Sequence, residues 1–436
     1  MLKGLSLGIL LLGGISSALA QSSTDWATFW PTTGDGFTEP EMVRVDALGN
    51  SFVTGSTPVG DEEFTFVQKY DTNGSLLWTT TYDGPGLSCS CPMDMQLDSA
   101  GNAIVTGHVE DLDTSLTTWF TLKVTSAGAV AWAKTDFVGE STGVQIGAGD
   151  HVFVNGFADN GTSVDIVTRK ISSNGAIVWT KSWNGSGNTP DYGTQLGIDD
   201  AGNLYAGGYS VGSTTGPAIV QRVIKYTPNG ARLWVKTFAL AGRDVTPVKV
   251  IGKPGGGCYV ASQADGADFF DAYAVVSSHD VDGNPIWRRT IDLHPSRREE
   301  VIDMAMSGLG DVTAVTNADS ATDTDILVRR FDSVGNVTWT KKYALGGGGD
   351  ELASRIGVTA GGTVYVVGTE RHLDGSWESL VLKYNPAGVR LWDSLYPSAE
   401  GFANGVDLAI DGTKAVVLAQ NQTTPTRWAS MVFRIQ

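Results

Sequence analysis

Beyond its first 20 residues, the sequence has no apolar run of the roughly 18 residues that a membrane-spanning helix needs. It is also short of positive charge, with 30 Lys and Arg against 47 Asp and Glu and a formal net charge of −17. A chain this acidic repels phosphate backbones and anionic lipid headgroups. We therefore expect neither nucleic-acid binding nor membrane insertion.

Cysteine is scarce, with only Cys89, Cys91 and Cys258 in 436 residues. In an exported protein Cys89 and Cys91 could form a small strained disulfide loop, or both could be free thiols. Cys258 lies in "GGGCYVAS", which has the apolar pattern of a strand. This pattern favours a small buried residue over a catalytic nucleophile.

Common catalytic motifs are not seen in the context that their chemistry needs. Gly-x-Ser-x-Gly occurs as "GLSLG" at 4–8, inside the N-terminal apolar segment, and as "GESTG" at 139–143 and "GYSVG" at 208–212, where no helical pattern follows; "GGGGD" at 346–350 lacks the spacing of a dinucleotide-binding loop. No phosphate-binding loop with Lys-Ser/Thr occurs. The histidines show no metal-binding spacing, and we expect each to be a surface or turn residue: His108, His151, His279, His294 and His372.

The first residues have the layout of a cleaved secretory signal. One Lys precedes an apolar stretch from Leu5 to Ile15, and small residues end in Ala18-Leu19-Ala20. We expect cleavage after Ala20, so residues 1–20 form the signal peptide. The mature protein is then predicted to be secreted or periplasmic.

What the sequence does have is a repeat. Seven segments carry Gly four residues before Trp, as in "YDTNGSLLW" at 70 and "YNPAGVRLW" at 384. The tryptophans recur every 47 to 55 residues: Trp78, Trp132, Trp179, Trp234, Trp287, Trp339 and Trp392. A period of this length with strand-type composition indicates a solenoid or a propeller.

A second hairpin signature lies between successive tryptophans, as in "LDSAGNAIVTG" from 97. Each repeat therefore contains four short antiparallel strands. The first three lack a clean polar face, as expected where both faces of a sheet pack against neighbouring sheets. Together with the absence of helical periodicity, this predicts an all-β fold, a β-propeller of four-stranded blades.

The two ends of the mature chain each contribute part of a blade. "DWATFW" contains Trp26 and Trp30 at the spacing of a fourth strand, and the C-terminus supplies three strands without a fourth. Pairing residues 25 to 30 with 429 to 436 would close the ring and remove its open edges. We predict one eight-bladed propeller domain over residues 21–436, present as a monomer.

These repeats resemble the bacterial β-propeller repeat called SBBP, on "DSAGNAIVTGH", "FVQKYDTNGSLLWTTTY" and "LVLKYNPAGVRLW". The resemblance covers residues 25 to 436 and implies the fold and export, but no common activity. The Gly-x-x-x-Trp element also resembles the docking repeats of eight-bladed quinoprotein dehydrogenases. That second resemblance ends there, because this chain is shorter and has no adjacent Cys pair.

Candidate ligand-binding residues come from aligning the innermost strands of the predicted blades. The residue before each apolar pair should lie at one depth in the central channel: Met42, Asp94, Gly143, Gln195, Pro247, Asp303, Arg355 and Asp407. Asp303, Arg355 and Asp407 come from successive blades. They and Asp94 could hold a polar ligand, or the Arg could pair with carboxylates and neutralise buried charge.

Several loops between the second and third strands are acidic, such as "DSATDTD" at 319. Asp319, Asp323 and Asp325 could supply oxygen ligands to Ca²⁺, or these loops could simply be solvated. No complete calcium-loop pattern is present.

These observations leave three hypotheses on function. The first is an exported scaffold that binds a protein or a glycan through its loop-rich face, since no catalytic set is assembled. The second is a hydrolase or lyase that acts on an extracellular polymer with Asp94, Asp303, Arg355 and Asp407 as acid, base or metal ligands. The third, a quinone-dependent oxidoreductase, is disfavoured by the missing Cys pair and the short chain.

Overall fold

A computed structural model describes residues 23–436, apart from 32–37, 61, 85–87, 213–216, 269, 294–296, 346–347 and 425–426. The predicted signal peptide and His294 lie outside the described residues. Among the residues described, the elements are strands and one short 3₁₀ helix, Ala148–Asp150. No helix in this part of the chain is long and apolar enough to cross a membrane.

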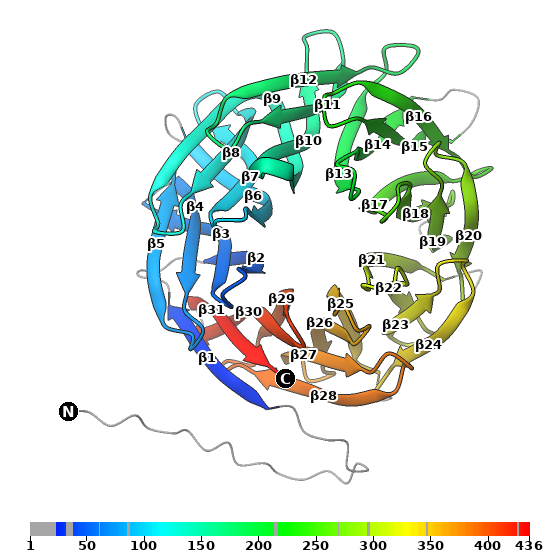
Figure 1. Cartoon of the computed structure of the whole chain (residues 1–436). Helices are drawn as coiled ribbons and strands as arrows, with labels where there is room; N and C mark the ends of the chain where they lie inside the picture. The colour runs from blue at the N-terminus through cyan, green and yellow to red at the C-terminus, as the bar shows by residue number, and fades with distance from the viewer. Residues whose placement is uncertain are drawn as a thin grey trace.

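Radially arranged antiparallel sheets form a closed ring, the architecture of a β-propeller (Figure 1). Five of the sheets have four strands each. They consist of β13 (Asp191–Ile198), β14 (Leu204–Val211), β15 (Ile219–Tyr226) and β16 (Arg232–Phe238); β17 (Asp244–Gly252), β18 (Cys258–Asp265), β19 (Ala272–His279) and β20 (Pro285–Ile291); β21 (Glu299–Met306), β22 (Val312–Asp319), β23 (Thr324–Phe331) and β24 (Val337–Tyr343); β25 (Asp350–Val358), β26 (Val364–Arg371), β27 (Trp377–Tyr384) and β28 (Arg390–Pro397); and β29 (Ala403–Asp411), β30 (Lys414–Thr424), β31 (Arg427–Ile435) and β1 (Thr24–Pro31).

The remaining eleven strands form one continuous sheet. They are β2 (Glu39–Val45), β3 (Ser51–Val59), β4 (Glu62–Tyr70), β5 (Leu76–Tyr82), β6 (Ser88–Leu97), β7 (Ala103–Asp111), β8 (Leu116–Val124), β9 (Val130–Gly147), β10 (His151–Asp159), β11 (Val164–Ile171) and β12 (Ile177–Trp183). Strand β9 is 18 residues long; its first half pairs with β8 and its second half with β10. It therefore runs without a break from the rim of one blade to the inner edge of the next.

The hydrophobic core lies between neighbouring blades. Ala261 and Val276, from the β17–β20 blade, share one cluster with Val312 and Leu327 from the β21–β24 blade. The second and third strands of these blades are buried along most of their length. This two-sided burial explains why the sequence of these strands shows no polar face.

The recurring Gly-x-x-x-Trp element connects successive blades. Gly74 has a φ of 80° in the turn between β4 and β5, and a Cβ there would lie 2.4 Å from the Trp26 ring of the preceding blade. Trp78 in turn covers Gly128, and its Nε1 donates to the Ser126 carbonyl at 3.2 Å. The same contact recurs around the ring: Trp132 on Gly175, Trp179 on Gly230, Trp234 on Gly283, Trp287 on Gly335 and Trp339 on Gly388.

The predicted pairing of the two chain ends is confirmed. Strand β1 pairs antiparallel with β31, so that an N-terminal strand is the outermost strand of the C-terminal sheet. Trp30 packs on Phe66 of the next blade with ring centroids 5.2 Å apart.

One expectation about the histidines is wrong. His279 is fully buried in β19, where its ring lies 4.3 Å from that of Phe238 and its Nε2 is 2.9 Å from the Ser277 hydroxyl. It is the last residue of the third strand of its blade, a position at which Tyr226 and Phe331 are also buried in the two neighbouring blades. Cys258 is buried as predicted, and Cys89 and Cys91 are free thiols.

Candidate functional site

The candidate site lies on the innermost strands of the blades. Each of these strands contains a β-bulge, at which the register with the second strand shifts by one residue, as between Val301 and Asp303. The residue after the bulge lies at the same register position in every blade: Met42, Asp94, Gly143, Gln195, Lys249, Asp303, Arg355 and Asp407.

This register corrects one position of the predicted ring. The sequence alignment placed Pro247 there, but the bulge in β17 lies between Pro247 and Lys249. Val248 is the bulged residue of β17, as Ile302 is of β21, and the residue after the bulge occupies the ring. The ring position is therefore Lys249, which adds a positive charge that the sequence alignment missed.

The three ring aspartates accept backbone N–H groups from the blade that follows. Asp407 Oδ2 accepts from Val43 N at 2.9 Å, and Asp94 Oδ2 accepts from Val144 N at 2.9 Å. Asp303 Oδ2 accepts from Ile356 N at 3.3 Å. Each carboxylate thus joins two innermost strands, which assigns it a structural role before any ligand is considered.

Charged side chains on the innermost strands of six neighbouring blades also form a chain of ion pairs. Lys249 Nζ lies 3.7 Å from Asp303 Oδ1, and Arg355 Nε lies 4.0 Å from Asp303 Oδ2. Arg355 Nε also donates to Asp407 Oδ1 at 2.8 Å. The structure therefore brings the predicted residues Asp303, Arg355 and Asp407 together.

Arg44, which the sequence analysis did not select, extends the chain of charges to Asp94. Its Nη1 donates to Asp407 at 2.9 Å, and its Nη2 donates to Asp94 at 3.2 Å. It lies two residues after the ring position on β2, so the register that predicts the ring does not include it. Charges of opposite sign thus alternate from β17 to β6: Lys249, Asp303, Arg355, Asp407, Arg44 and Asp94.

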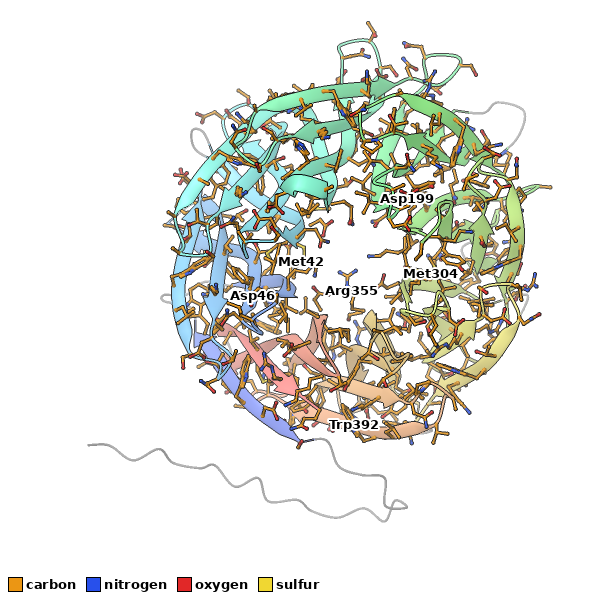
Figure 2. All side chains as sticks on the ribbon, in the orientation of Figure 1. Met42, Asp46, Asp199, Met304, Arg355 and Trp392 are labelled. Carbon is orange, nitrogen blue, oxygen red and sulfur yellow. The ribbon has the colours of Figure 1, made fainter. Side chains whose placement is uncertain are left out.

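The accessible part of this network is mainly cationic. The side chains of Arg44, Lys249 and Arg355 are 24%, 36% and 35% exposed, whereas those of Asp303 and Asp407 are 4% and 1% exposed. Asp407, followed by Asp303, raises the pKa of Arg355, whose guanidinium stays charged. Figure 2 shows Arg355 projecting into the centre of the ring.

Arg44, Lys249 and Arg355 line a cavity of about 390 Å³. Its other lining residues include Val45, Ile251 and Ile410, which follow the ring positions on their strands. The cavity therefore occupies the half of the channel nearest the turns between first and second strands. This is the face opposite the acidic loops that the sequence analysis favoured.

The predicted calcium ligands do not come together. Asp325 Oδ2 pairs with Lys342 Nζ at 2.6 Å, and Asp319 accepts from the Thr324 hydroxyl at 3.0 Å. Asp323 accepts from the Ser320 hydroxyl. Within the described residues, the carboxylates and thiols close enough to share a metal ion are Glu63, Cys89 and Cys91.

Comparison with solved structures supports the propeller fold. The Dos1 propeller aligns with a TM-score of 0.57 and 8% sequence identity, over 94% of this chain and 95% of that one. The polysaccharide lyase Uly1 aligns with a TM-score of 0.49 and 10% identity, over 95% and 98% of the two chains. The propeller domain of the trilobed protease from Pyrococcus furiosus gives 0.45 and 7%, over 82% and 96%.

At these identities the similarity concerns the fold alone. The names of the matched structures, the Dos1 propeller and two polysaccharide lyases, therefore assign no function to this chain. No family profile and no curated protein matches the sequence.

Proposed function

We propose that this protein is an exported, non-catalytic binding scaffold whose central cavity receives a carboxylate or sulfate group of a glycan or protein partner. The observation that carries the proposal is the arrangement of Arg44, Lys249 and Arg355. All three line one cavity, and they are more exposed than the carboxylates with which they pair. Cationic side chains in a concave site attract anionic groups, and Arg can bind them through two parallel hydrogen bonds.

The same proposal includes an eight-bladed, SBBP-type ring. The eleven-stranded sheet divides into three units of four strands, β2–β5, β6–β9 and β9–β12, with β9 shared between two of them. Together with the five separate four-stranded sheets this gives eight units. Export rests on the sequence of residues 1–20, and the mass of the mature N-terminus tests it.

A polymer-acting hydrolase or lyase is the second candidate. One observation favours this enzymatic function: the cations around the cavity would neutralise the charge of an acidic sugar. Asp303 and Asp407 already accept backbone N–H groups and pair with Arg355, so neither is placed as a free acid or base. Incubation with polyuronates and analysis of chain length tests this candidate, and we expect no cleavage.

Calorimetric titration with an oligogalacturonate, a neutral oligosaccharide of equal length and a poly-Glu peptide tests the binding proposal. We expect the acidic ligands to bind and the neutral one not to bind. Binding should weaken as salt rises, because the ionic contacts are partly solvated. The oligogalacturonate and the peptide together distinguish a glycan partner from a protein partner.

A matched pair of variants assigns the binding to the cavity. Lys249→Gln removes a charge that lines the cavity, and Lys341→Gln removes an exposed one from the outer strand β24. Loss of one charge-assisted contact should weaken binding by about tenfold. Equal affinity in the two variants, or no binding by the wild type, would overturn the proposal.

The calcium prediction is tested separately: an unchanged melting temperature in millimolar Ca²⁺ would remove it.

A further inference from the structure

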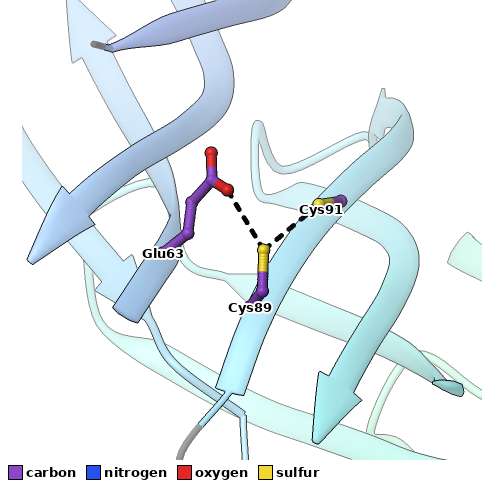
Figure 3. A group of neighbouring side chains, drawn as sticks. All are labelled: Glu63, Cys89 and Cys91. Carbon is purple, nitrogen blue, oxygen red and sulfur yellow. Dashed lines mark hydrogen bonds between the residues drawn. The ribbon is translucent and has the colours of Figure 1, made fainter. Parts of the chain in front are cut away.

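A second cluster of reactive side chains lies away from the cavity, where two blades meet. Cys89 Sγ lies 3.1 Å from Glu63 Oε2 and 3.8 Å from Cys91 Sγ (Figure 3). The ligand atoms of all three residues lie within 4.8 Å of one another. Glu63 belongs to β4 and the two cysteines to β6, so the cluster joins consecutive units of the ring.

Strand geometry accounts for this arrangement. Cys89 and Cys91 are two residues apart on a strand, which places their side chains on the same side. A single parallel bridge pairs Glu63 with Cys89 and brings the carboxylate beside the thiols. The backbone thus holds three potential metal ligands in place.

The surroundings of the cluster are acidic. Burial, followed by Glu63, raises the pKa of the Cys89 thiol, and burial also raises that of Cys91. Burial together with Glu39 and Glu63 raises the pKa of Glu41 to about 8. Among the ion pairs of the described residues, none joins Lys or Arg to Glu39, Glu41 or Glu63. A bound cation would therefore relieve repulsion that no side chain shown here neutralises.

The distance between the sulfur atoms fits a tetrahedral metal better than a disulfide. Two Zn–S bonds of about 2.3 Å at the tetrahedral angle place the sulfurs about 3.8 Å apart. The observed separation is 3.8 Å, whereas a disulfide requires about 2.05 Å. Thiolate ligands select borderline and soft metals, which makes zinc a better fit than calcium or magnesium.

We propose that Glu63, Cys89 and Cys91 bind a thiophilic divalent cation such as Zn²⁺, with solvent completing its coordination. Each thiol would lose its proton to the solvent when the metal–sulfur bond forms, so that affinity rises with pH. The ion would connect β4 to β6. Its binding should therefore stabilise the junction between the two units.

Titration of the reduced, metal-free full chain with Co²⁺ under anaerobic conditions tests the proposal. Tetrahedral cobalt bound by thiolates gives a sulfur-to-metal charge-transfer band and visible d–d bands, which report the ligands directly. We expect one equivalent of Co²⁺ to produce both sets of bands, and Zn²⁺ to bleach them. Zn²⁺ alone should raise the melting temperature.

Three variants assign the ligands. Cys89→Ser and Cys91→Ser should each abolish the charge-transfer band, and Glu63→Gln should weaken binding about tenfold or more. Cys258→Ala is the matched control, because it removes the remaining, buried thiol and should leave the band unchanged. Far-ultraviolet circular dichroism checks that each variant is folded.

Three outcomes would overturn the proposal. They are a wild-type protein without the charge-transfer band, a band that persists when both Cys89 and Cys91 are serine, and a band that is lost in Cys258→Ala. Equal affinity in Glu63→Gln would overturn the assignment of the carboxylate as a ligand. None of these outcomes depends on binding at the central cavity, so this test is independent of the proposed function.

Discussion

At the scale of single residues, the role of a charged side chain depends on which backbone groups face it. Asp303 and Asp407 were selected from the sequence as candidate ligands, yet both accept a backbone N–H from the next blade. Arg355 lies between them and balances their charge. The positive side chains are therefore the more accessible to a ligand.

His279 provides a test at the same scale. Burial lowers its pKa from 6.5 to about 4, so the folded protein keeps the imidazole neutral where the unfolded chain would protonate it. The unfolded state then binds more protons between these pH values, and stability falls as the pH drops through this window. The loss amounts to at most about 3 kcal/mol.

Urea denaturation of the wild type, His279→Gln and His151→Gln at several pH values measures this effect. His151 is only half-buried, so its substitution removes a histidine without removing a fully buried one and serves as the control. Other groups titrate in the same range, and the comparison between variants cancels them. We expect His279→Gln to lose less stability than the other two proteins between pH 6.5 and 4. If the free energy of unfolding fell equally with pH in all three proteins, His279 would not be the source of the pH dependence.

A site residue could be predicted from the sequence where its position follows from the strand register alone. Asp94, Asp303, Arg355 and Asp407 share a simple register with the apolar pairs of their strands, so alignment found them. Lys249 was missed because Val248 and Val250 look like the apolar pair of β17, whereas Val248 is the bulged residue and the ring position comes directly before Val250. Apolar spacing alone does not distinguish the bulged residue from the first member of the pair. No such signal exists for Arg44, because its contacts arise from the packing of three blades.

At the scale of secondary-structure elements, the repeat motif acts between blades. The tryptophan of one outer strand covers the glycine in the turn of the next blade, as Trp287 does at Gly335. Gly is required there for two reasons: the backbone has positive φ, and the indole leaves no room for a Cβ. The sequence shows the motif but not these contacts, because the Gly of one copy contacts the Trp of the preceding blade and the Trp of the same copy contacts the Gly of the next blade.

Substitution of two glycines with the same φ distinguishes the effect of backbone conformation from that of the indole contact. Gly335 and Gly310 both have a φ of +84°, but a Cβ would lie 2.5 Å from the Trp287 ring at Gly335 and would have nothing within 4 Å at Gly310. Gly310→Ala should cost about 1–2 kcal/mol for the left-handed conformation alone. Gly335→Ala should cost about 1–3 kcal/mol more, because the indole must move. Denaturation of both variants measures the difference, and equal losses would show that the Trp287 contact is unimportant.

Strand number and pairing were largely predictable, because the hairpin signals recur in each repeat. The fusion of two strands into β9 was not predicted. Residues 130–147 have no turn sequence strong enough to interrupt the ladder, and Gly139, with a φ of 136°, lets the chain pass between blades while staying extended. The ends of elements depend on such local backbone freedom, which hydrophobic periodicity does not report.

At the scale of the whole molecule, charge is distributed unevenly. The chain carries a formal net charge of −17, yet one half of its channel presents Arg44, Lys249 and Arg355. The acidic remainder should repel anionic ligands at long range, and this repulsion is screened beyond about 8 Å at physiological salt. A ligand anchored in the cavity therefore needs close contacts with the three cations, which favours a compact anionic group.

Closure of the ring depends on a single strand from the other end of the chain. If residues up to Pro31 are removed, β31 loses its partner and the Trp26 contact with Gly74 is lost. Burial of two tryptophans contributes several kcal/mol, so we expect the melting temperature of the truncated protein to fall by roughly 5–10 °C. The exposed edge of β31 should also pair with other molecules, which light scattering would detect as self-association.

Phe29→Ser is the matched control for this truncation. Phe29 lies in β1 opposite Met431 but is 54% exposed, so its replacement keeps the ladder and removes little buried surface. We expect this variant to scatter light no more than the wild type and to melt near the wild-type temperature. If the truncated protein behaved in the same way, the other inter-blade contacts would be sufficient to hold the ring closed. The contribution of β1 would then be limited to covering the edge of β31.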